Sequence, residues 1–403
     1  MSIIVQKYGG SSVADTEKIR RIARQVCSAK RSGSDIVVVV SAMGKQTDEL
    51  LSMARALTDE PSRRELDMLL TVGERITMAL LSIAIQAEGF EAVSLTGSQS
   101  GIITNDRHVD ARIIEVRPVR VEDELAMGRI VIVAGFQGVS YKKEITTLGR
   151  GGSDTTAVAL AAALGAEHCE IYSDVDGVYS ADPSRIETAG HISAVSYQEM
   201  QEMSTAGARV LNAQAVEFAK QAGIAIYCRA SFAPGRETVI RRSVPGEDHG
   251  VRAVVTERDV VRGRLRGPGL DDLMKKLLQT ARDLGVVFKE VGLSVPSKQD
   301  WSRGSFVIST SDVPDWRKVR RGLVEAGGGQ LEIDESAAAV SLIGEGINMD
   351  GRNLLKAMEL MGEAKAPVLG IATTSFRISM LTEVDRLDYA AGELHRAFIE
   401  EKG

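Results

Sequence analysis

The chain of 403 residues exceeds the usual size of one hydrophobic core, so two or three domains are expected. Hydrophobic residues make up 44% of the chain and charged residues 26%, which is ordinary for a soluble globular protein. A formal net charge of −6 gives no reason to expect nucleic acid or an anionic membrane as a partner.

Cysteine and histidine usage excludes two further classes of protein. Cys27, Cys169 and Cys228 lie far apart with no CxxC pair, and the five histidines show no ligand spacing. Neither a disulfide framework nor a zinc site is therefore predicted. No signal peptide is recognised, and the longest strictly apolar runs are far too short to cross a bilayer. We expect the protein in a reduced cytoplasm.

Apolar strand patterns alternate with helical patterns through the first 240 residues. The predicted strands are residues 3–5, 36–40, 92–95, 130–134, 170–172 and 225–227. The predicted helices are residues 15–30, 47–58, 63–86, 155–164 and 197–221, with Gly165 and Gly223 where helix ends are expected. The alternation predicts an α/β domain with a mostly parallel sheet between helix layers. Ligand loops are expected at the carboxyl ends of its strands.

Two glycine-rich segments each join a predicted strand to a predicted helix. The first is Lys7–Ser12 (KYGGSS) and the second is Thr146–Thr155 (TTLGRGGSDT). Glycine lets the backbone approach a ligand closely, and successive amides at a helix start form an anion site. One loop carries a lysine and the other an arginine and an aspartate, which indicates a site for phosphate and a charged acceptor.

The two common phosphate-binding patterns are absent elsewhere. Residues 44–46 (GKQ) break the Walker pattern, and residues 344–349 (GEGINM) break GxGxxG. Phosphate binding is therefore expected at the two glycine-rich loops. Phosphoryl transfer requires positioning and charge neutralisation more than covalent help, and Lys7 is suited to act as a point charge on the transferring phosphate.

The composition changes after residue 242. Residues 243–250, with Pro245 and Gly246, are predicted to be a linker. Two β-α-β-β-α units follow, in residues 251–334 and 335–403. The first has its strands near 260, 286–291 and 306–309 and its helices at 271–283 and 316–325. The second has its strands at 339–343, 368–373 and 377–381 and its helices at 353–360 and 385–398. Each unit is predicted to be a ferredoxin-like α/β sandwich.

Five motifs in order resemble the aspartokinase family of amino-acid kinases. They are residues 5–14, 41–48, 73–75, 148–164 and 174–183, and the resemblance is strong over about 1–242 and weaker beyond. It implies an amino-acid-kinase fold in residues 1–242, followed by paired ACT-type regulatory units. It also implies ATP-dependent phosphorylation of the side-chain carboxylate of L-aspartate to 4-phospho-L-aspartate, an entry to lysine, threonine and methionine biosynthesis.

The resemblance assigns roles residue by residue. ATP, with Mg²⁺ bridging its phosphates and few protein ligands to the metal, would contact Lys7, Gly9, Gly10, Ser11, Ser173, Asp174, Tyr179, Asp182 and Arg185. The acceptor would contact Ser41, Thr47, Glu74, Arg150 and Ser153. Asp154 would align the cations around the phosphate. An arginine fork suits an α-carboxylate, and Glu74 suits the ammonium. No general base is needed, because the pKa of an aspartate side chain, about 3.9, leaves the acceptor ionised.

Three departures from the family pattern bear on this assignment. Arg209, in residues 207–211 (GARVL), stands where the family usually has a lysine, which keeps the charge but changes the geometry. Arg185 follows Asp-Pro-Ser rather than Asp-Pro, so a one-residue bulge is expected. The effector loops are altered, and only Asn348, Asp350 and Ser375 in the second unit are candidate effector ligands.

Several functions remain open at this stage. Glutamate 5-kinase, carbamate kinase and uridylate kinase are the alternatives within the superfamily. A different class is a catalytically weak paralogue that binds an amino acid or nucleotide as a regulatory partner, which Arg209 and the altered loops motivate. We expect a homodimer joined through residues 251–403, with weak or absent inhibition by lysine and threonine.

Overall fold

The computed structural model describes residues 2–149, 151–233, 235–243, 250–294, 302–311, 313 and 315–401. The chain forms two compact units. The first comprises Met1–Val178, His191–Ser204 and Arg209–Glu247, and the second Tyr179–Gly190, Thr205–Ala208 and Asp248–Gly403. Two short segments from before residue 242 thus fold with the C-terminal part of the chain. Most of the predicted linker lies outside the described residues.

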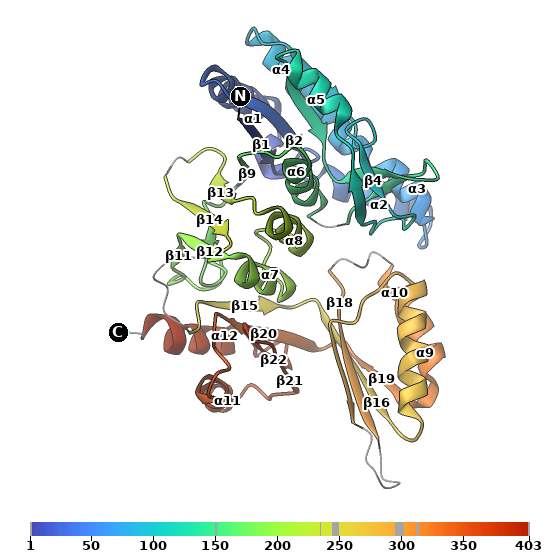
Figure 1. Cartoon of the computed structure of the whole chain (residues 1–403). Coiled ribbons are helices and arrows are strands. Elements are labelled where there is room, and N and C mark those ends of the chain that lie inside the picture. The colour runs from blue at the N-terminus through green and yellow to red at the C-terminus, as the bar shows by residue number, and fades with distance from the viewer. Residues whose placement is uncertain are drawn as a thin grey trace. The chain divides into compact units, whose positions relative to one another are not determined.

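An eight-stranded sheet forms the centre of the first unit, and it confirms the expected α/β class (Figure 1). Its strand order is β12-β14-β13-β9-β1-β2-β6-β3, and every neighbouring pair is parallel except β13 and β14. The strands are β1 (Ile3–Tyr8), β2 (Asp35–Val40), β3 (Ala92–Leu95), β6 (Ile130–Ala134), β9 (His168–Ser173), β12 (Ala194–Ser196), β13 (Ile226–Ala230) and β14 (Glu237–Arg241). All six predicted strands are present, because their apolar runs suit a sheet covered on both faces.

Helices cover both faces of this sheet. The helices α1 (Thr16–Arg31) and α4 (Val72–Ala87) pack against one face of the sheet. Alternate residues of β1, β2 and β6 point to this face and form one hydrophobic core with the two helices. The helix α6 (Gly152–Ala163) contacts β1, β2 and β9, and α8 (Ala213–Ala222) packs on α6. Every residue from Gly152 to Ala161 is buried. The start of α6 is therefore fixed at the carboxyl edge of the sheet.

Two of the predicted helices are wrong in extent. The stretch 63–86 is divided at Thr71 into α3 (Arg63–Leu70) and α4. The stretch 197–221 contains α7 (Tyr197–Thr205) and α8, separated by a loop. Gly207 in that loop has a φ of +113°, which a helix does not allow, and the Asn212 side chain accepts from the Gln214 amide to begin α8. Periodicity alone does not detect such a break.

The helix α2 (Gln46–Leu57) matches its prediction closely. Several shorter elements of the first unit were not predicted, among them α5 (Val119–Ala126), β4 (Ile102–Thr104), β5 (Ile113–Val116), β7 (Gln137–Ser140) and β8 (Ile145–Thr147). The four strands form a small sheet in the order β5-β4-β7-β8. They have three or four residues each, too few for a clear alternation of polar and apolar positions.

One helical stretch among the described residues, Arg63–Ala87, has the length and apolar composition of a membrane span. Half of its apolar 18-residue window is buried inside the protein, and a helix in the core of a globular domain meets the same criteria.

The second unit contains two four-stranded sheets (Figure 1). The first has the order β17-β18-β16-β19 and the second β15-β20-β22-β21. Their elements are β15 (Ala253–Glu257), β16 (Val260–Arg266), α9 (Leu270–Asp283), β17 (Glu290–Ser294), β18 (Arg303–Ser309), α10 (Trp316–Gly327), β19 (Leu331–Asp334), β20 (Ala337–Ile343), α11 (Arg352–Glu363), β21 (Gly370–Thr373), β22 (Arg377–Glu383) and α12 (Leu387–His395).

The strand pairing differs from the linear division into residues 251–334 and 335–403. Strand β15 lies within residues 251–334, yet it pairs antiparallel with β20 in the second sheet. The first sheet instead gains β19, which pairs with β16 and was not predicted. The two units are therefore interleaved, and each sheet is completed by a strand outside the predicted pattern.

The core of the first of these sheets depends on a close contact at Gly263. The Phe306 ring stacks on Phe288 with 4.0 Å between ring centroids, and both side chains are buried. A Cβ atom at Gly263 would lie 2.1 Å from Cζ of Phe306. Glycine is thus required at this position by the ring that covers it.

We expect Gly263→Ala to lower the free energy of unfolding by about 1–3 kcal/mol, because the added methyl displaces a packed ring. The measurement is denaturant unfolding of both proteins. Gly362→Ala, on α11 with open space around its Cβ position, is the matched control and should raise stability by up to about 1 kcal/mol. A Gly263→Ala protein as stable as the parent would show that Phe306 moves aside without cost.

Candidate active site

A buried ion pair lies at the carboxyl edge of the large sheet. Lys7 is near the end of β1, and Asp154 is in the first turn of α6. Lys7 Nζ lies 2.7 Å from Asp154 Oδ1, and the two residues are only 9% and 7% exposed. The carboxylate neutralises and orients the ammonium, and its place at a helix N-terminus is electrostatically favourable. The structure thus brings together the two charged residues that the sequence assigned to the phosphate.

The first glycine-rich loop adjoins this lysine. Gly9 donates its amide to Tyr172 O at 3.1 Å, and a Cβ atom on Gly9 would lie 3.5 Å from Lys7 Nζ. A Cβ atom on Gly10 would lie 2.9 Å from Ala42 O, so a side chain there would collide with the backbone. Ser11 is exposed, in the 3-10 turn Gly10–Val13. A side chain at Gly9 would therefore contact the Lys7 ammonium, and glycine is required at position 10 by the close approach of the Ala42 carbonyl.

Glu74 is a buried carboxylate with an incomplete set of hydrogen bonds. It lies in the first turn of α4 and is 3% exposed. Its Oε1 accepts from the Ala42 amide at 3.0 Å, while Oε2 is buried without a hydrogen-bond partner. Burial raises its pKa from 4.5 to about 7. A buried acceptor of this kind suits a cationic ligand group, such as an ammonium.

The other expected acceptor residues lie on neighbouring elements. Ser41 follows β2 and donates its amide to Tyr8 O at 3.2 Å, and Thr47 is in the first turn of α2. Ser153 is buried in the first turn of α6, where a Cβ atom on Gly135 would lie 2.7 Å from its Oγ. Arg150 lies outside the described residues.

The acceptor loop, residues 148–152, depends on left-handed glycines. Gly149 and Gly151 have φ values of +73° and +70°, a conformation that side chains disfavour. Phe136 also has a positive φ, +67°, which is uncommon for a bulky residue. Its carbonyl accepts from the Leu148 amide at 2.9 Å. Phe136 therefore supports the acceptor loop, and nothing in the sequence marks its backbone conformation.

The expected nucleotide residues are divided between the two units. Ser173 ends β9, where its hydroxyl accepts from the Val175 amide, and the exposed Asp174 follows it in the first unit. Tyr179, Asp182 and Arg185 belong to the second unit.

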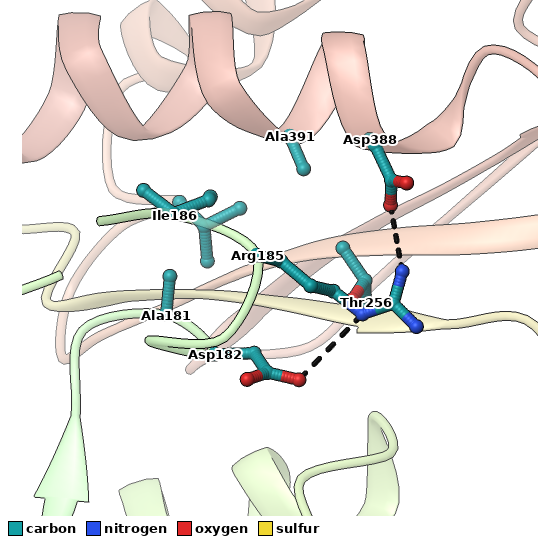
Figure 2. A pocket seen from close by; sticks show the side chains of 8 residues that line it. Ala181, Asp182, Arg185, Ile186, Thr256, Asp388 and Ala391 are labelled. Atoms are coloured by element: carbon teal, nitrogen blue, oxygen red, sulfur yellow. Dashed lines mark hydrogen bonds and ion pairs between the residues drawn. The ribbon is translucent and has the colours of Figure 1, made fainter. Parts of the chain in front are cut away.

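Arg185 is engaged by the C-terminal helix. Its Nη1 lies 3.0 Å from Asp388 Oδ1 on α12, and its Nε lies 3.6 Å from Asp182 Oδ2 (Figure 2). Arg258 also pairs with Asp388. The Asp182 carboxylate also accepts from the Ser184 amide and hydroxyl, which shapes the turn after Pro183. The expected bulge is thus a tight turn, and its arginine points to α12.

Arg209 lies in the loop between α7 and α8, not in the helix that the periodicity predicted. It is exposed. Asn212, three residues later, lies against the acceptor loop, because a Cβ atom on Gly151 would be 2.8 Å from Asn212 Cβ. The loop that carries Arg209 is therefore adjacent to the loop that carries Arg150. Sequence reasoning missed Asn212, although its helix-capping type was a signal for the start of α8.

Comparison with known proteins decides the family. A profile of the amino acid kinase family matches residues 2–230. The aspartokinase of Mycolicibacterium smegmatis is 42% identical over 405 residues, with 99% of this chain and 96% of that protein covered. This chain belongs to the aspartokinases of the amino acid kinase family. The aspartokinase of Geobacillus stearothermophilus is 40% identical, with 99% of this chain and 97% of that protein covered.

Solved structures agree with this assignment. Aspartokinase III of E. coli, in complex with aspartate and ADP, has a TM-score of 0.83 at 22% identity, covering 98% of this chain and 99% of that one. The aspartate kinase of Synechocystis has a TM-score of 0.54 at 33% identity, covering 98% of this chain and 69% of that one. The expected fold, a kinase domain followed by ACT-type units, is confirmed.

The raised pKa of Glu74 predicts how stability depends on pH. A group with a folded-state pKa above its unfolded value binds protons more tightly when folded, so the free energy of unfolding falls as pH rises between about 4.5 and about 7. The substitution Glu74→Gln removes this fall in the free energy of unfolding, which is on the order of 3 kcal/mol for a pKa shift of this size. We expect the variant to melt above the parent at pH 8, and the difference to vanish near pH 4.5. Ligand-free melting curves across this range measure it, and parallel curves would contradict the raised pKa.

Proposed function

We propose that the chain catalyses ATP-dependent phosphorylation of the side-chain carboxylate of L-aspartate, which gives 4-phospho-L-aspartate and ADP. The near full-length similarity to aspartokinases supports this reaction. The main support within the structure is that a fixed positive charge and an unpaired carboxylate oxygen lie at the same edge of the sheet. Lys7, held by Asp154, supplies a fixed positive charge, and Glu74 offers a buried carboxylate oxygen that lacks a partner.

The reaction requires charge neutralisation and alignment. A side-chain oxygen of aspartate attacks the γ-phosphorus, the bond from that phosphorus to the bridging oxygen breaks, and ADP leaves with the electron pair. Lys7 lies where its ammonium can follow the charge on the transferring group, and Asp154 keeps it oriented. The attacking carboxylate is already ionised, so no side chain has to remove a proton.

The acceptor side is built for an amino acid. Arg150 suits the α-carboxylate as a bidentate fork, and Glu74 suits the α-ammonium. Ser41, Thr47 and Ser153 offer hydroxyl groups to the bound acceptor. Because a bound ammonium favours the ionised form of Glu74, acceptor binding also compensates the burial that raises its pKa.

ATP and Mg²⁺ complete the proposed site. Within the described residues, no group of three or more His, Cys, Asp or Glu side chains is arranged to hold a metal ion. The glycine at position 9, beside the Lys7 ammonium, supports the binding of nucleotide phosphates at this loop. Magnesium would be held mainly by phosphate oxygens, and its charge would neutralise those oxygens. We assign Ser173, Asp174, Tyr179 and Asp182 to the nucleotide, with Arg209 as the second cation.

The C-terminal units are proposed to join two chains into a homodimer with little response to lysine or threonine. Two of the three candidate effector residues, Asn348 and Asp350, are already used within the chain. Asn348 donates to the carbonyl oxygens of Thr374 and Arg377, and Asp350 pairs with Arg352. An effector would have to replace these bonds, which lowers its net gain on binding.

A coupled assay of ADP release tests the reaction. It compares L-aspartate, L-glutamate, carbamate and UMP as acceptors, with ATP and Mg²⁺ present throughout. We expect aspartate to give the highest kcat/KM. Equal or better turnover with any of the other three acceptors would overturn the proposal, and ATP binding without aspartate-dependent ADP release would indicate a regulatory paralogue.

We expect Lys7→Ala and Asp154→Ala each to lower kcat by about 10²-fold or more, because each removes a preorganised charge from the transferring phosphate or its orienting partner. Steady-state kinetics at saturating aspartate and ATP measure the effect. Lys30→Ala is the matched control. It breaks a half-buried lysine–aspartate pair of the same 2.7 Å length, with Asp35 at the start of β2, and should leave kcat unchanged. An equal loss in all three variants would indicate a general effect of lost ion pairs.

A further inference from the structure

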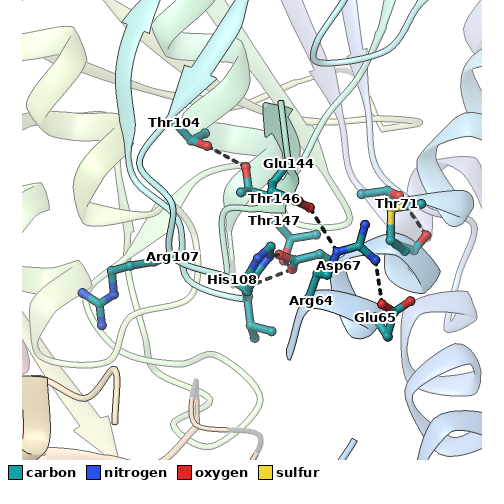
Figure 3. A network of polar contacts seen from close by, with 12 residues as sticks. Arg64, Glu65, Asp67, Thr71, Thr104, Arg107, His108, Glu144, Thr146 and Thr147 are labelled. Carbon is teal, nitrogen blue, oxygen red and sulfur yellow. Dashed lines mark hydrogen bonds and ion pairs between the residues drawn. The ribbon is translucent and has the colours of Figure 1, made fainter. Parts of the chain in front are cut away.

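A fully buried carboxylate outside the proposed site lies beside the acceptor loop. Asp67, on α3, is 0% exposed. Its Oδ1 accepts from Thr147 Oγ1 at 2.6 Å and from the Val109 amide at 2.9 Å, and its Oδ2 lies 2.6 Å from His108 Nδ1 (Figure 3). Three donors from two separate segments therefore converge on one side chain.

Both of these segments lead directly to the acceptor loop. Thr147 ends β8 and is followed at once by residues 148–152. Its carbonyl accepts from the Ala111 amide at 2.8 Å, and a Cβ atom on Gly149 would lie 3.2 Å from Asp110 Oδ1. The segment 108–111 thus lies along the loop, and Asp67 connects this segment to the strand from which the loop begins.

The backbone of the segment is strained where it meets Asp67. Val109 has a φ of +75°, which is a genuine outlier for a β-branched residue. Its amide points to Asp67 in this conformation. Strain of this kind persists only where the surroundings over-determine it, and it gathers at functional sites.

The charge of Asp67 depends on the same contacts. Burial raises the pKa of its carboxyl, while the hydrogen bonds from Thr147, His108 and Val109 lower it. The effect of burial is the larger, so the pKa is raised, and the three donors oppose that rise. Loss of any one donor weakens the connection as a whole.

We propose that Asp67, together with His108 and Thr147, is a positioning centre that holds the acceptor loop in the conformation that binds aspartate. The proposal rests on the proposed function, in which this loop contacts the acceptor. Asp67 acts through Thr147 and the segment 108–111, because its own carboxylate is fully enclosed. Its effect should therefore fall on the acceptor and leave the nucleotide unaffected.

The test compares steady-state kinetics of Asp67→Ala and Thr147→Val with the parent enzyme. Thr147→Val keeps the shape of the side chain and removes only its hydroxyl donor. We expect KM for aspartate to rise about tenfold or more in both variants, since a displaced loop misplaces the groups that bind the acceptor. KM for ATP and kcat at saturating aspartate should stay within about threefold of the parent values. Arg150→Ala serves as the positive control for lost acceptor binding.

A matched control separates positioning from general destabilisation. Glu199, in the first turn of α7, is a carboxylate buried to 1% exposure, where it accepts from the Ser196 amide and hydroxyl. We expect Glu199→Ala to lower the melting temperature without a change in KM for aspartate. A rise in KM in all of the destabilised variants alike would overturn the positioning role.

Two further measurements make the proposal specific. Asp67→Asn keeps an acceptor oxygen for Thr147 and Val109 and offers an amide to the other tautomer of His108, so it should restore most of the acceptor affinity. In the double variant Asp67→Ala/Thr147→Val, the two effects on KM should be clearly less than multiplicative, as for residues in one network.

The outcomes distinguish failure of the proposal from failure of the proposed function. If the parent enzyme phosphorylates aspartate but Thr147→Val and Asp67→Ala bind it as the parent does, the positioning role is overturned. If the parent shows no aspartate-dependent ADP release, the proposed function itself fails. Should Asp67→Ala not fold, Thr147→Val decides, and an unchanged KM for aspartate in that variant counts against the proposal.

Discussion

The ion pair between Lys7 and Asp154 is the interaction on which the site depends. Lys7 lies on β1, which is enclosed between β2 and β9, so its ammonium has little access to water. Burial of an unpaired charge is costly, and the first turn of α6 supplies the carboxylate that offsets this cost. This pairing requires α6 to begin at the sheet edge, and the left-handed Gly149 and Gly151 make that start possible. The same constraint places the start of α6 beside the Lys7 ammonium.

The two charged groups proposed to bind the ligands differ in their surroundings. Lys7, proposed to contact the phosphate, is paired with Asp154 before any ligand binds. Glu74, proposed to contact the acceptor ammonium, has one buried oxygen without a partner and a pKa raised to about 7. A buried group left unpaired in the empty protein gains its partner only from a ligand with the right donor. Such sites reject analogues that lack this donor more strongly than apolar pockets reject a shape.

The C-terminal part of the chain holds a segment that the sequence assigned to the nucleotide. Residues 179–190 belong to the second unit. Ser180 Oγ lies 2.8 Å from Nε2 of the fully buried His395, and Thr188 donates to Glu400, which also contacts His395. Arg185 pairs with Asp388 on α12. Asp182, proposed to bind the nucleotide, is thus connected to α12 through Arg185.

The sequence by itself determined the class of fold and the order of its main elements. Continuous apolar runs specify buried strands such as β2 and β6, and the glycine-rich segments pointed to Lys7 and Asp154, which the structure joins in an ion pair. Sequence periodicity mispredicted a helix where its extent depends on a single backbone angle, as at Gly207, which divides the predicted helix 197–221. Periodicity also could not predict contacts between residues that are far apart in the sequence. Strand β15 joins the second sheet, Arg185 meets Asp388 203 residues later, and Asp67 binds Thr147 80 residues later. Only the tertiary structure decided these pairings, because each depends on which surfaces meet when the sheets pack, and no local periodicity records that.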